Sequence, residues 1–295
     1  NIQECPICKN QNLQAFIRCE DYTVSHETFE VVRCVNCTLA ITSPRPDIDK
    51  LGRYYQSDEY ISHSGKSPGG IGFLYKIARS FSLNWKKKTI HQHKTNGSVL
   101  DFGCGTGEFL SSMGQSGWEV AGVEPSPAAR LKAEGLTRQK VYSALENIPQ
   151  KKFDVITAWH VIEHVPNLIE TSRQLTGLLK KDGIIFIAVP NYQSPDADSY
   201  QNHWAGFDVP RHLWHFSKSS MTTLLQSAGL KLIDIIPMKL DAYYVSMLSE
   251  KYRNTNKIGL GTLFRGFISG LQSNVKARKN LNHSSLIYVS KVHEA

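Results

Sequence analysis

The feature that most constrains the fold is a glycine-rich turn between an apolar strand and a helix. Its residues are Ser98-Val-Leu-Asp-Phe-Gly-Cys-Gly-Thr-Gly-Glu-Phe-Leu110. Val99 and Leu100 are typical of a buried parallel strand, and an amphipathic segment begins at Glu108. Glycines at positions 103, 105 and 107 leave a backbone without Cβ atoms, which a nucleotide-like ligand can approach closely. We therefore expect a ligand site where this strand ends.

From residue 97 onward, strands and helices alternate, which is the pattern of a doubly wound α/β sheet. Strands are expected at 99–102, 118–123, 140–142, 153–158, 183–189, 230–236 and 285–290. Helices are expected at 108–117, 126–134, 167–181 and 217–228. The pattern predicts a seven-stranded, Rossmann-like sheet whose ligand lies at the carboxyl ends of the first two strands.

The chain divides into three parts. The two prolines of Thr42-Ser-Pro-Arg-Pro46 mark the first boundary, and helical segments are expected at 48–60 and 71–90. The parts are a cysteine module (1–45), a helical linker or cap (46–95) and the α/β domain (96–295), which contains an aromatic-rich lid (191–216) and a helical insertion (241–279).

Two cysteine pairs lie in the first part. Cys5-Pro-Ile-Cys8 and Cys34-Val-Asn-Cys37 are separated by 25 residues, as in a zinc ribbon. Four thiolates can surround one Zn²⁺ in a closed, structural site, so we expect Cys5, Cys8, Cys34 and Cys37 to bind zinc. The alternative is four free or oxidised cysteines. Cys19 is expected to be a buried thiol within a loop.

Two acidic residues select the ligand of the glycine turn. The third glycine comes one residue too early for a dinucleotide fingerprint, and Asp101 would repel a pyrophosphate. A carboxylate there suits a cationic amino group instead. Glu124 ends the second strand, where it can accept hydrogen bonds from both hydroxyls of a ribose. A ribose joined to a cationic amino acid describes S-adenosylmethionine better than NAD.

Four segments then resemble a known family. Val99–Gly107 resembles motif I of class I S-adenosylmethionine-dependent methyltransferases, and Gly122-Val-Glu124 resembles their second-strand motif. The segment from Phe153 to Pro166 is similar to the fourth-strand region of the ubiquinone-biosynthesis type, and 181–191 matches the fifth-strand hairpin. The cysteine module resembles that of bacterial methyltransferases of sugar and polysaccharide biosynthesis.

The resemblance implies a set of cofactor contacts. It implies that the methionine and ribose part lies at the glycine turn, that Glu124 binds the ribose diol, and that the adenine lies near the residues after the second and third strands. The implied residues are Asp101, Gly103, Cys104, Gly105, Glu124, Pro125, Ala144, Leu145, Ala158, Trp159 and His160. No Asp or Asn follows the third strand, where such enzymes often contact the adenine amine.

Histidines are the candidate catalytic residues. Methyl transfer to a hydroxyl needs in-line positioning and removal of a proton, and histidine is a natural base near neutral pH. His212-x-x-x-Phe216-Ser217 in the lid resembles a motif of these methyltransferases. We therefore rank His212 first as the base, His160 second and His164 third. The alternative for His164 is a structural hydrogen bond, and His215 is expected to pack.

Charge and composition limit the kinds of partner and location that we expect. The net charge is +8 with a pI near 9.1, and no apolar run reaches bilayer-spanning length. With no secretory signal at the N-terminus, we expect a cytoplasmic enzyme acting on a small molecule or a glycan precursor. An RNA substrate is the alternative, but residues 1–44 carry three basic and five acidic residues, which suits phosphates poorly.

Membrane contact is a further alternative. The basic segment 71–90 and the insertion at 241–279 both show apolar residues at helical spacing. We expect these residues to pack on the α/β domain. The alternative is that they contact a membrane surface or cover a lipid-linked acceptor. The sequence leaves the oligomeric state and the atom that is methylated open.

Overall fold

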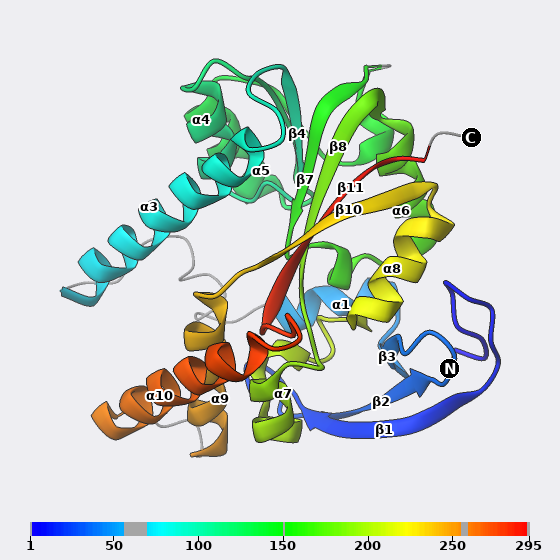
Figure 1. Ribbon diagram of the computed structural model, residues 1–295, viewed down its shortest axis with the longest axis vertical. Helices are drawn as coiled ribbons and strands as arrows, with labels where there is room; N and C mark the ends of the chain where they lie inside the picture. The colour runs from blue at the N-terminus through cyan, green and yellow to red at the C-terminus, as the bar shows by residue number, and fades with distance from the viewer. Residues whose placement is uncertain (1, 56–69, 150, 255–258, 294–295) are drawn as a thin grey trace.

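Two β-sheets organise the chain in the computed structural model, which describes residues 2–55, 70–149, 151–254 and 259–293 (Figure 1). The larger sheet has the strand order β10-β11-β8-β7-β4-β5-β6, in which only β11 runs antiparallel to its neighbours. Its strands are β4 (Ser98–Phe102), β5 (Glu119–Val123), β6 (Val141–Tyr142), β7 (Phe153–Trp159), β8 (Leu179–Pro190), β10 (Leu230–Pro237) and β11 (Ser285–Val292). The seven predicted strands and the Rossmann-like fold are thereby confirmed.

Helices cover both faces of this sheet, which explains why most residues of its central strands are apolar and buried. In Figure 1, α4 (Glu108–Gly114) and α5 (Pro127–Thr137) lie to the left of the sheet, and α6 (Leu168–Gly177) and α8 (Lys218–Ser227) lie to its right. Ser126 Oγ caps α5 by accepting the Ala129 N–H. Such local signals made these helix starts predictable.

One predicted boundary is wrong. The sequence pattern extended the helix before the fifth strand to residue 181, but α6 ends at Gly177 and β8 begins at Leu179. Leu179 is buried and pairs with Phe153 of β7, while Lys180 Nζ donates to Asp154 Oδ2 at 2.8 Å. Sheet pairing and this ion pair therefore override the helical pattern.

The smaller sheet joins the cysteine module to the lid. Its order is β1-β2-β3-β9, with β1 (Leu13–Glu20), β2 (Thr28–Cys34), β3 (Ala40–Thr42) and β9 (Trp214–His215). Ala40 pairs with His215 and Ile41 with Trp214, so two lid residues complete a sheet that begins near the N-terminus. Cys19 is buried at the end of β1, so its predicted burial is confirmed and its predicted loop position is wrong.

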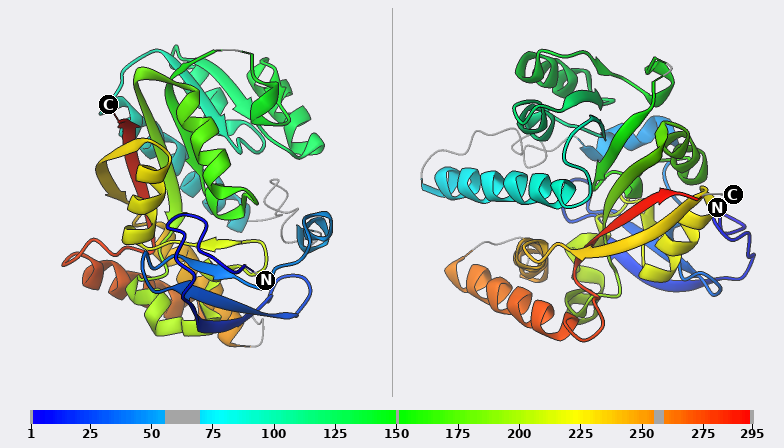
Figure 2. Two further views of the ribbon diagram at one scale, coloured as in Figure 1. Left: turned by 90° about the vertical axis from the view of Figure 1, so that its right-hand side faces the viewer. Right: turned by 45° about the horizontal axis from the view of Figure 1, so that its top comes forward.

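Three longer helices lie outside the two sheets. In Figure 1 and in the right-hand view of Figure 2, α3 (Gly70–His91) and α10 (Leu260–Ala277) extend outward from the sheets, and α9 (Asp241–Arg253) packs on α10. The short elements are α1 (Ile48–Leu51), η1 (Gly52–Tyr55), η2 (Leu145–Asn147), η3 (Ile162–His164), α7 (Pro195–Tyr200), η4 (Gln201–His203) and η5 (Ala205–Phe207). The rest of the predicted helix 48–60 lies outside the described residues. Among the described residues, no helix is both long enough and apolar enough to span a bilayer.

The expected packing of the insertion is wrong for α10. Phe264 is 67% exposed and Leu260 is 88% exposed, whereas small residues such as Gly266 and Gly270 face α9. The spacing of apolar residues was therefore interpreted correctly as helical, but the apolar face points away from the protein.

A buried ion pair fastens the lid to the smaller sheet. Arg211 is 1% exposed, and its guanidinium donates to Asp208 and, at 2.8 Å, to Asp21 Oδ1 after the end of β1. It also donates to the Tyr54 carbonyl at 2.9 Å. Asp21 in turn accepts the Ser25 N–H. Arg211 therefore has a structural role, since all three of its guanidinium nitrogens donate to protein partners.

We expect Arg211→Met to lower the free energy of unfolding by about 3–5 kcal/mol at pH 7, because it leaves buried carboxylates unpaired. Burial opposes ionisation of Asp21 and Asp208, yet Arg211 holds both pKa values below the ordinary range. The contribution of the pair is therefore present near neutral pH and is lost as the pH falls through those low values. Urea unfolding should therefore show a smaller difference between the two proteins well below pH 4 than at pH 7.

Arg253→Met is the matched control, because Arg253 is half exposed and lies 3.8 Å from Glu250. Glu250 is buried but keeps Arg265 as a partner at 3.1 Å, so loss of the half-exposed Arg253 should cost about 0–1 kcal/mol. Equal losses in the two variants would contradict the structural role of Arg211.

Candidate functional site

The glycine turn lies at the carboxyl end of β4, held against β5 by main-chain hydrogen bonds. The N–H groups of Gly103 and Cys104 donate to the Val123 carbonyl at 2.8 and 3.0 Å. Gly105 has φ +53°, and among the described residues no atom would lie within 4 Å of a Cβ built on it. Gly103 instead needs the absence of a side chain, because its Cβ would meet Val161 at 2.4 Å. The turn is therefore packed on one side and open on the other.

Glu124 ties the open side of the turn to the next strand. Its Oε2 accepts the Gly105 N–H at 3.0 Å and its Oε1 accepts the Ser126 N–H at 2.8 Å. Each carboxylate oxygen has a further lone pair for a ligand hydroxyl. Glu124 thus both shapes the turn and offers the acceptors that a ribose diol requires.

Asp101 is the buried acid of the turn. It accepts the Thr157 hydroxyl at 2.6 Å, and burial raises its pKa to about 7, although the Thr157 hydrogen bond and the charge of Lys86 act in the opposite direction. Burial lowers the pKa of Lys86, whose Nζ lies 4.6 Å from the centre of the Trp159 ring. A cationic ligand group beside Asp101 would favour its ionised form.

The remaining predicted cofactor residues lie at the same edge of the sheet. Pro125 follows β5, Ala144 and Leu145 follow β6, and Ala158 and Trp159 end β7. Cys104 could offer a ligand only its main chain, because its thiol is buried against Gly122, and this burial raises its pKa. The structure therefore brings the predicted set together along four parallel strands.

Beside this edge is a cavity of about 600 Å³ that gathers the predicted histidines. It lies between α3, α9, η3 and the lid. Its lining includes Ser82 and Lys86 of α3, His160, Glu163 and His164 near η3, Asp208 and His212 of the lid, and Asp241, Tyr244, Leu248 and Tyr252 of α9. The three ranked histidines thus share one cavity, as their proposed roles require.

His160 is held as a cation. Its Nε2 lies 3.0 Å from Asp241 Oδ2 and its Nδ1 lies 3.3 Å from Glu163 Oε1. Although burial acts against its charge, these two carboxylates raise the pKa of His160 to about 9. A protonated imidazole cannot accept a proton, so the geometry disfavours His160 as the base.

His164 and His212 meet edge to face, with ring centres 4.6 Å apart. Nδ1 of His164 lies 3.0 Å from the Arg211 carbonyl, and Nδ1 of His212 lies 2.9 Å from the Gly206 carbonyl. Each Nδ1 must therefore donate, which leaves each Nε2 as a proton acceptor in the neutral ring. Burial, reinforced by His212, lowers the pKa of His164 to about 4.

Asp208 holds His212 through the main chain, because the His212 N–H donates to the Asp208 carbonyl at 3.0 Å; Asp208 Oδ2 lies 3.9 Å from Nε2, too far for a hydrogen bond. Donor atoms of Glu163, His164 and His212 lie within 4.8 Å of one another, so one divalent cation could contact all three. His215 does not line the cavity. It is buried against Thr42, with burial lowering its pKa to about 3, in agreement with its expected packing role.

Sequence reasoning missed the acidic partners of these histidines. Glu163 and Asp208 had local signals, because one precedes His164 and the other lies one helical turn before His212. Lys86 and Asp241 had no such signal, since each reaches the cavity from a distant helix. Their roles depend on tertiary contacts that spacing does not encode.

The four predicted zinc ligands converge in the N-terminal module, where each Cys-x-x-Cys pair forms one knuckle. Their sulfur atoms all lie within 4.8 Å of one another, with Cys5 and Cys37 at 3.4 Å and Cys8 and Cys34 at 3.5 Å. Both knuckles have the same turn: the N–H groups of Lys9 and Thr38 donate to the carbonyls of the first cysteines at 2.9 and 3.0 Å. This arrangement suits tetrahedral sulfur coordination.

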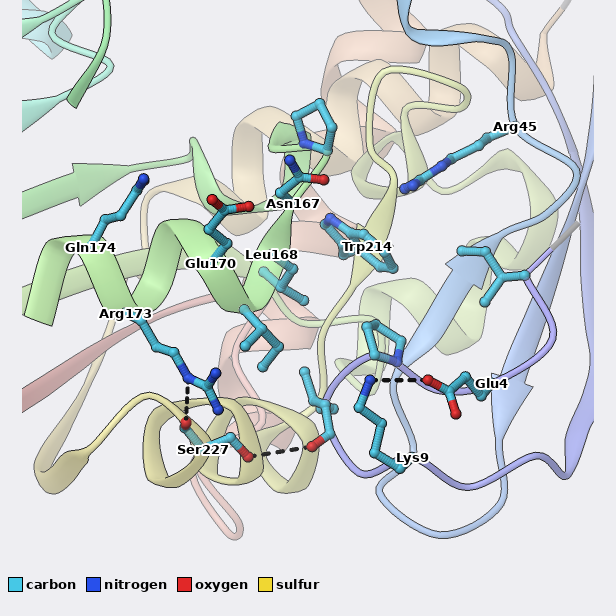
Figure 3. Close-up of a pocket in the computed structure, with 15 residues that line it drawn as sticks. Glu4, Lys9, Arg45, Asn167, Leu168, Glu170, Arg173, Gln174, Trp214 and Ser227 are labelled. Carbon is cyan, nitrogen blue, oxygen red and sulfur yellow. Dashed lines mark hydrogen bonds and ion pairs between the residues drawn. The ribbon is translucent and has the colours of Figure 1, made fainter. Parts of the chain in front are cut away.

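A second cavity, of about 860 Å³, lies between the first knuckle and α6 (Figure 3). Glu4, Lys9 and Arg45 border it from the N-terminal module, and Arg173 borders it from α6, where Arg173 Nε donates to the Ser227 carbonyl. It contains none of the predicted cofactor or catalytic residues.

Comparison with known proteins places this geometry in a family. A family model described as "Methyltransferase domain" matches residues 74–235, more than half of the chain. The chain is 37% identical over 117 residues to a ubiquinone biosynthesis O-methyltransferase of Actinobacillus pleuropneumoniae, covering 34% of this chain and 50% of that protein. It is 30% identical over 170 residues to the enzyme of that name from Stutzerimonas stutzeri, covering 52% and 72%.

The fold comparison agrees. A protein of Galdieria sulphuraria assigned as a sarcosine dimethylglycine methyltransferase aligns with a TM-score of 0.52 at 15% identity, covering 74% of this chain and 88% of that one. The chain therefore belongs to the methyltransferase domain family. It spans about half the length of the first curated relatives it matches.

Proposed function

We propose that this chain is an S-adenosylmethionine-dependent methyltransferase that acts on a hydroxyl group of a small molecule or glycan precursor. The observation that carries the proposal is the pair of carboxylates, Asp101 and Glu124, on a glycine turn that is open to a ligand beside a histidine-lined cavity. Relatives at 30–37% identity named as O-methyltransferases support oxygen as the acceptor atom.

The residues at the sheet edge fit the proposed cofactor. Asp101 would face its cationic amino group, Glu124 would accept from its ribose hydroxyls, and Leu145 offers an apolar contact for a flat base. When bound, the cofactor supplies a methyl group on a positively charged sulfur. The open backbone at Gly105 provides the space that such a ligand needs.

The cavity provides the rest of the chemistry. His212 is the proposed base, because the Gly206 carbonyl fixes its Nδ1–H and leaves Nε2 to take the acceptor's proton. Glu163 and Asp241 keep His160 protonated, so His160 would instead donate a hydrogen bond to the acceptor. The Asp208 carbonyl accepts the His212 N–H, and Arg211 binds the Asp208 carboxylate, so this part of the lid keeps His212 in place.

We expect His212→Ala to lower kcat about 100- to 10,000-fold, because the acceptor hydroxyl loses its base. The affinity for S-adenosylmethionine should stay close to that of the unmodified protein. Release of S-adenosylhomocysteine would be measured with a panel of phenol, catechol and sugar acceptors, and cofactor affinity by titration calorimetry.

His203→Ala is the control, because His203 stacks on Tyr22 outside the cavity. Unchanged turnover in His212→Ala would remove His212 from the mechanism. Turnover that is lost in EDTA and restored by Mg²⁺ would instead assign Glu163, His164 and His212 to a catalytic metal site.

We also propose that Cys5, Cys8, Cys34 and Cys37 bind one structural zinc ion. Elemental analysis should give about one zinc per chain, because four sulfur ligands complete the coordination of this metal. Cys5→Ser should lose the zinc, whereas Cys19→Ser should retain it, since Cys19 lies outside the cluster. A natively purified protein without metal would contradict the zinc assignment.

A further inference from the structure

Helix α10 packs with its small residues inward and its large apolar residues outward. A Cβ on Gly266 would lie 2.6 Å from Met247 Cα, and one on Gly270 would lie 2.7 Å from Tyr243 Cα, so the backbones of α9 and α10 are in close contact. The outward residues, which we name the α10 stripe, are Leu260, Leu263, Phe264, Phe267, Leu271 and Val275. Each is 40–88% exposed.

This stripe is larger than the scattered apolar residues found on ordinary surfaces. An 18-residue helix is about 27 Å long, and the stripe follows most of that length. Burying two phenylalanines and four aliphatic side chains would contribute several kcal/mol. Contiguous exposed apolar surface of this kind marks a contact site.

Charge indicates what makes that contact. Residues 60–100 and 251–293 contain 15 of the chain's 34 Lys and Arg residues and none of its 26 Asp and Glu residues. The rest of the chain carries 19 basic and 26 acidic residues, so the whole positive net charge comes from these two segments. They include α3 and α10, respectively.

The two basic helices extend toward the same side of the molecule in Figure 1 and in the right-hand view of Figure 2. At the end of α10, Lys276, Arg278 and Lys279 are all exposed. Ser82 and Lys86 of α3 line the histidine cavity together with α9, on which α10 packs. A surface that contacts α3 and α10 would therefore lie close to the cavity.

We propose that α10 binds this protein to the surface of an anionic lipid bilayer. The α10 stripe enters the boundary between headgroups and acyl chains, and the surrounding Lys and Arg side chains face the anionic headgroups. This docking is independent of the proposed methyl transfer, because the stripe residues are not among those that line the histidine cavity.

Charge and polarity favour a bilayer over other partners. In a pair of copies joined by the stripe, the partner would offer no carboxylate from residues 251–293 to oppose Lys276, Arg278 and Lys279. An RNA would satisfy the positive charge but not the apolar stripe, since its exposed backbone is polar. An anionic bilayer satisfies both.

The test is co-sedimentation with vesicles of phosphatidylcholine alone or with about 30% phosphatidylglycerol. We expect the full chain to bind the anionic vesicles, and to bind the neutral ones at least about tenfold more weakly. Leu260→Ser/Phe264→Ser should weaken binding at least about tenfold, because it removes the two most exposed stripe side chains. Lys276→Glu/Lys279→Glu should reduce binding and its dependence on salt.

Leu131→Ser/Leu136→Ser is the matched control, because these two leucines are also exposed, at 71% and 48%, but lie on α5. Its binding should equal that of the unmodified chain, and thermal unfolding would check that every variant is folded. The proposal is overturned if the anionic vesicles are not bound. It is likewise overturned if Leu260→Ser/Phe264→Ser binds them as well as Leu131→Ser/Leu136→Ser does. It is also overturned if sedimentation equilibrium shows a dimer that Leu260→Ser/Phe264→Ser dissociates while vesicles remain unbound.

Discussion

The buried guanidinium of Arg211 is the interaction on which the arrangement of the cavity depends. It joins Asp21, after the end of β1, to Asp208 in the lid, two residues separated by most of the chain. The same lid places β9 against β3 and His212 in the cavity. The N-terminal module thus serves the site as a support: its sheet holds the lid, and the lid holds the histidine.

Histidines in the same cavity differ in their pKa values because their surroundings differ. His160 lies between two carboxylates and stays charged, with a pKa raised to about 9, whereas burial lowers the pKa of His164 to about 4. His212 packs edge to face on His164, with one nitrogen fixed by the Gly206 carbonyl. Environment rather than residue type therefore separates a hydrogen-bond donor from a proton acceptor.

Much of the fold could be predicted from local patterns. The glycine turn, the acid that ends β5 and the helix caps at Ser126 and Ser217 each depend on residues that are close in sequence. The clustering of the four cysteines could also be predicted, because each Cys-x-x-Cys pair forms a local turn.

Long-range features could not be predicted in this way. Lys86 and Asp241 reach the cavity from helices whose positions depend on packing, and β9 exists only because β3 lies beside it. The orientation of α10 was predicted wrongly because apolar spacing indicates a face but not what the face contacts. The face of α10 that carries its glycines packs on α9, since only small residues allow the two helices to approach so closely.

The most direct test of the central claim is the affinity of the glycine turn for S-adenosylmethionine, measured by titration calorimetry. The full chain should bind it, and Glu124→Ala should weaken binding at least about tenfold, because two charge-assisted hydrogen bonds to the ribose are lost. Glu119→Ala, at the start of the strand that Glu124 follows, changes an exposed carboxylate paired with Lys151 and should bind normally. Equal affinities in the two variants, or binding of NAD in place of S-adenosylmethionine, would contradict the assignment of this site.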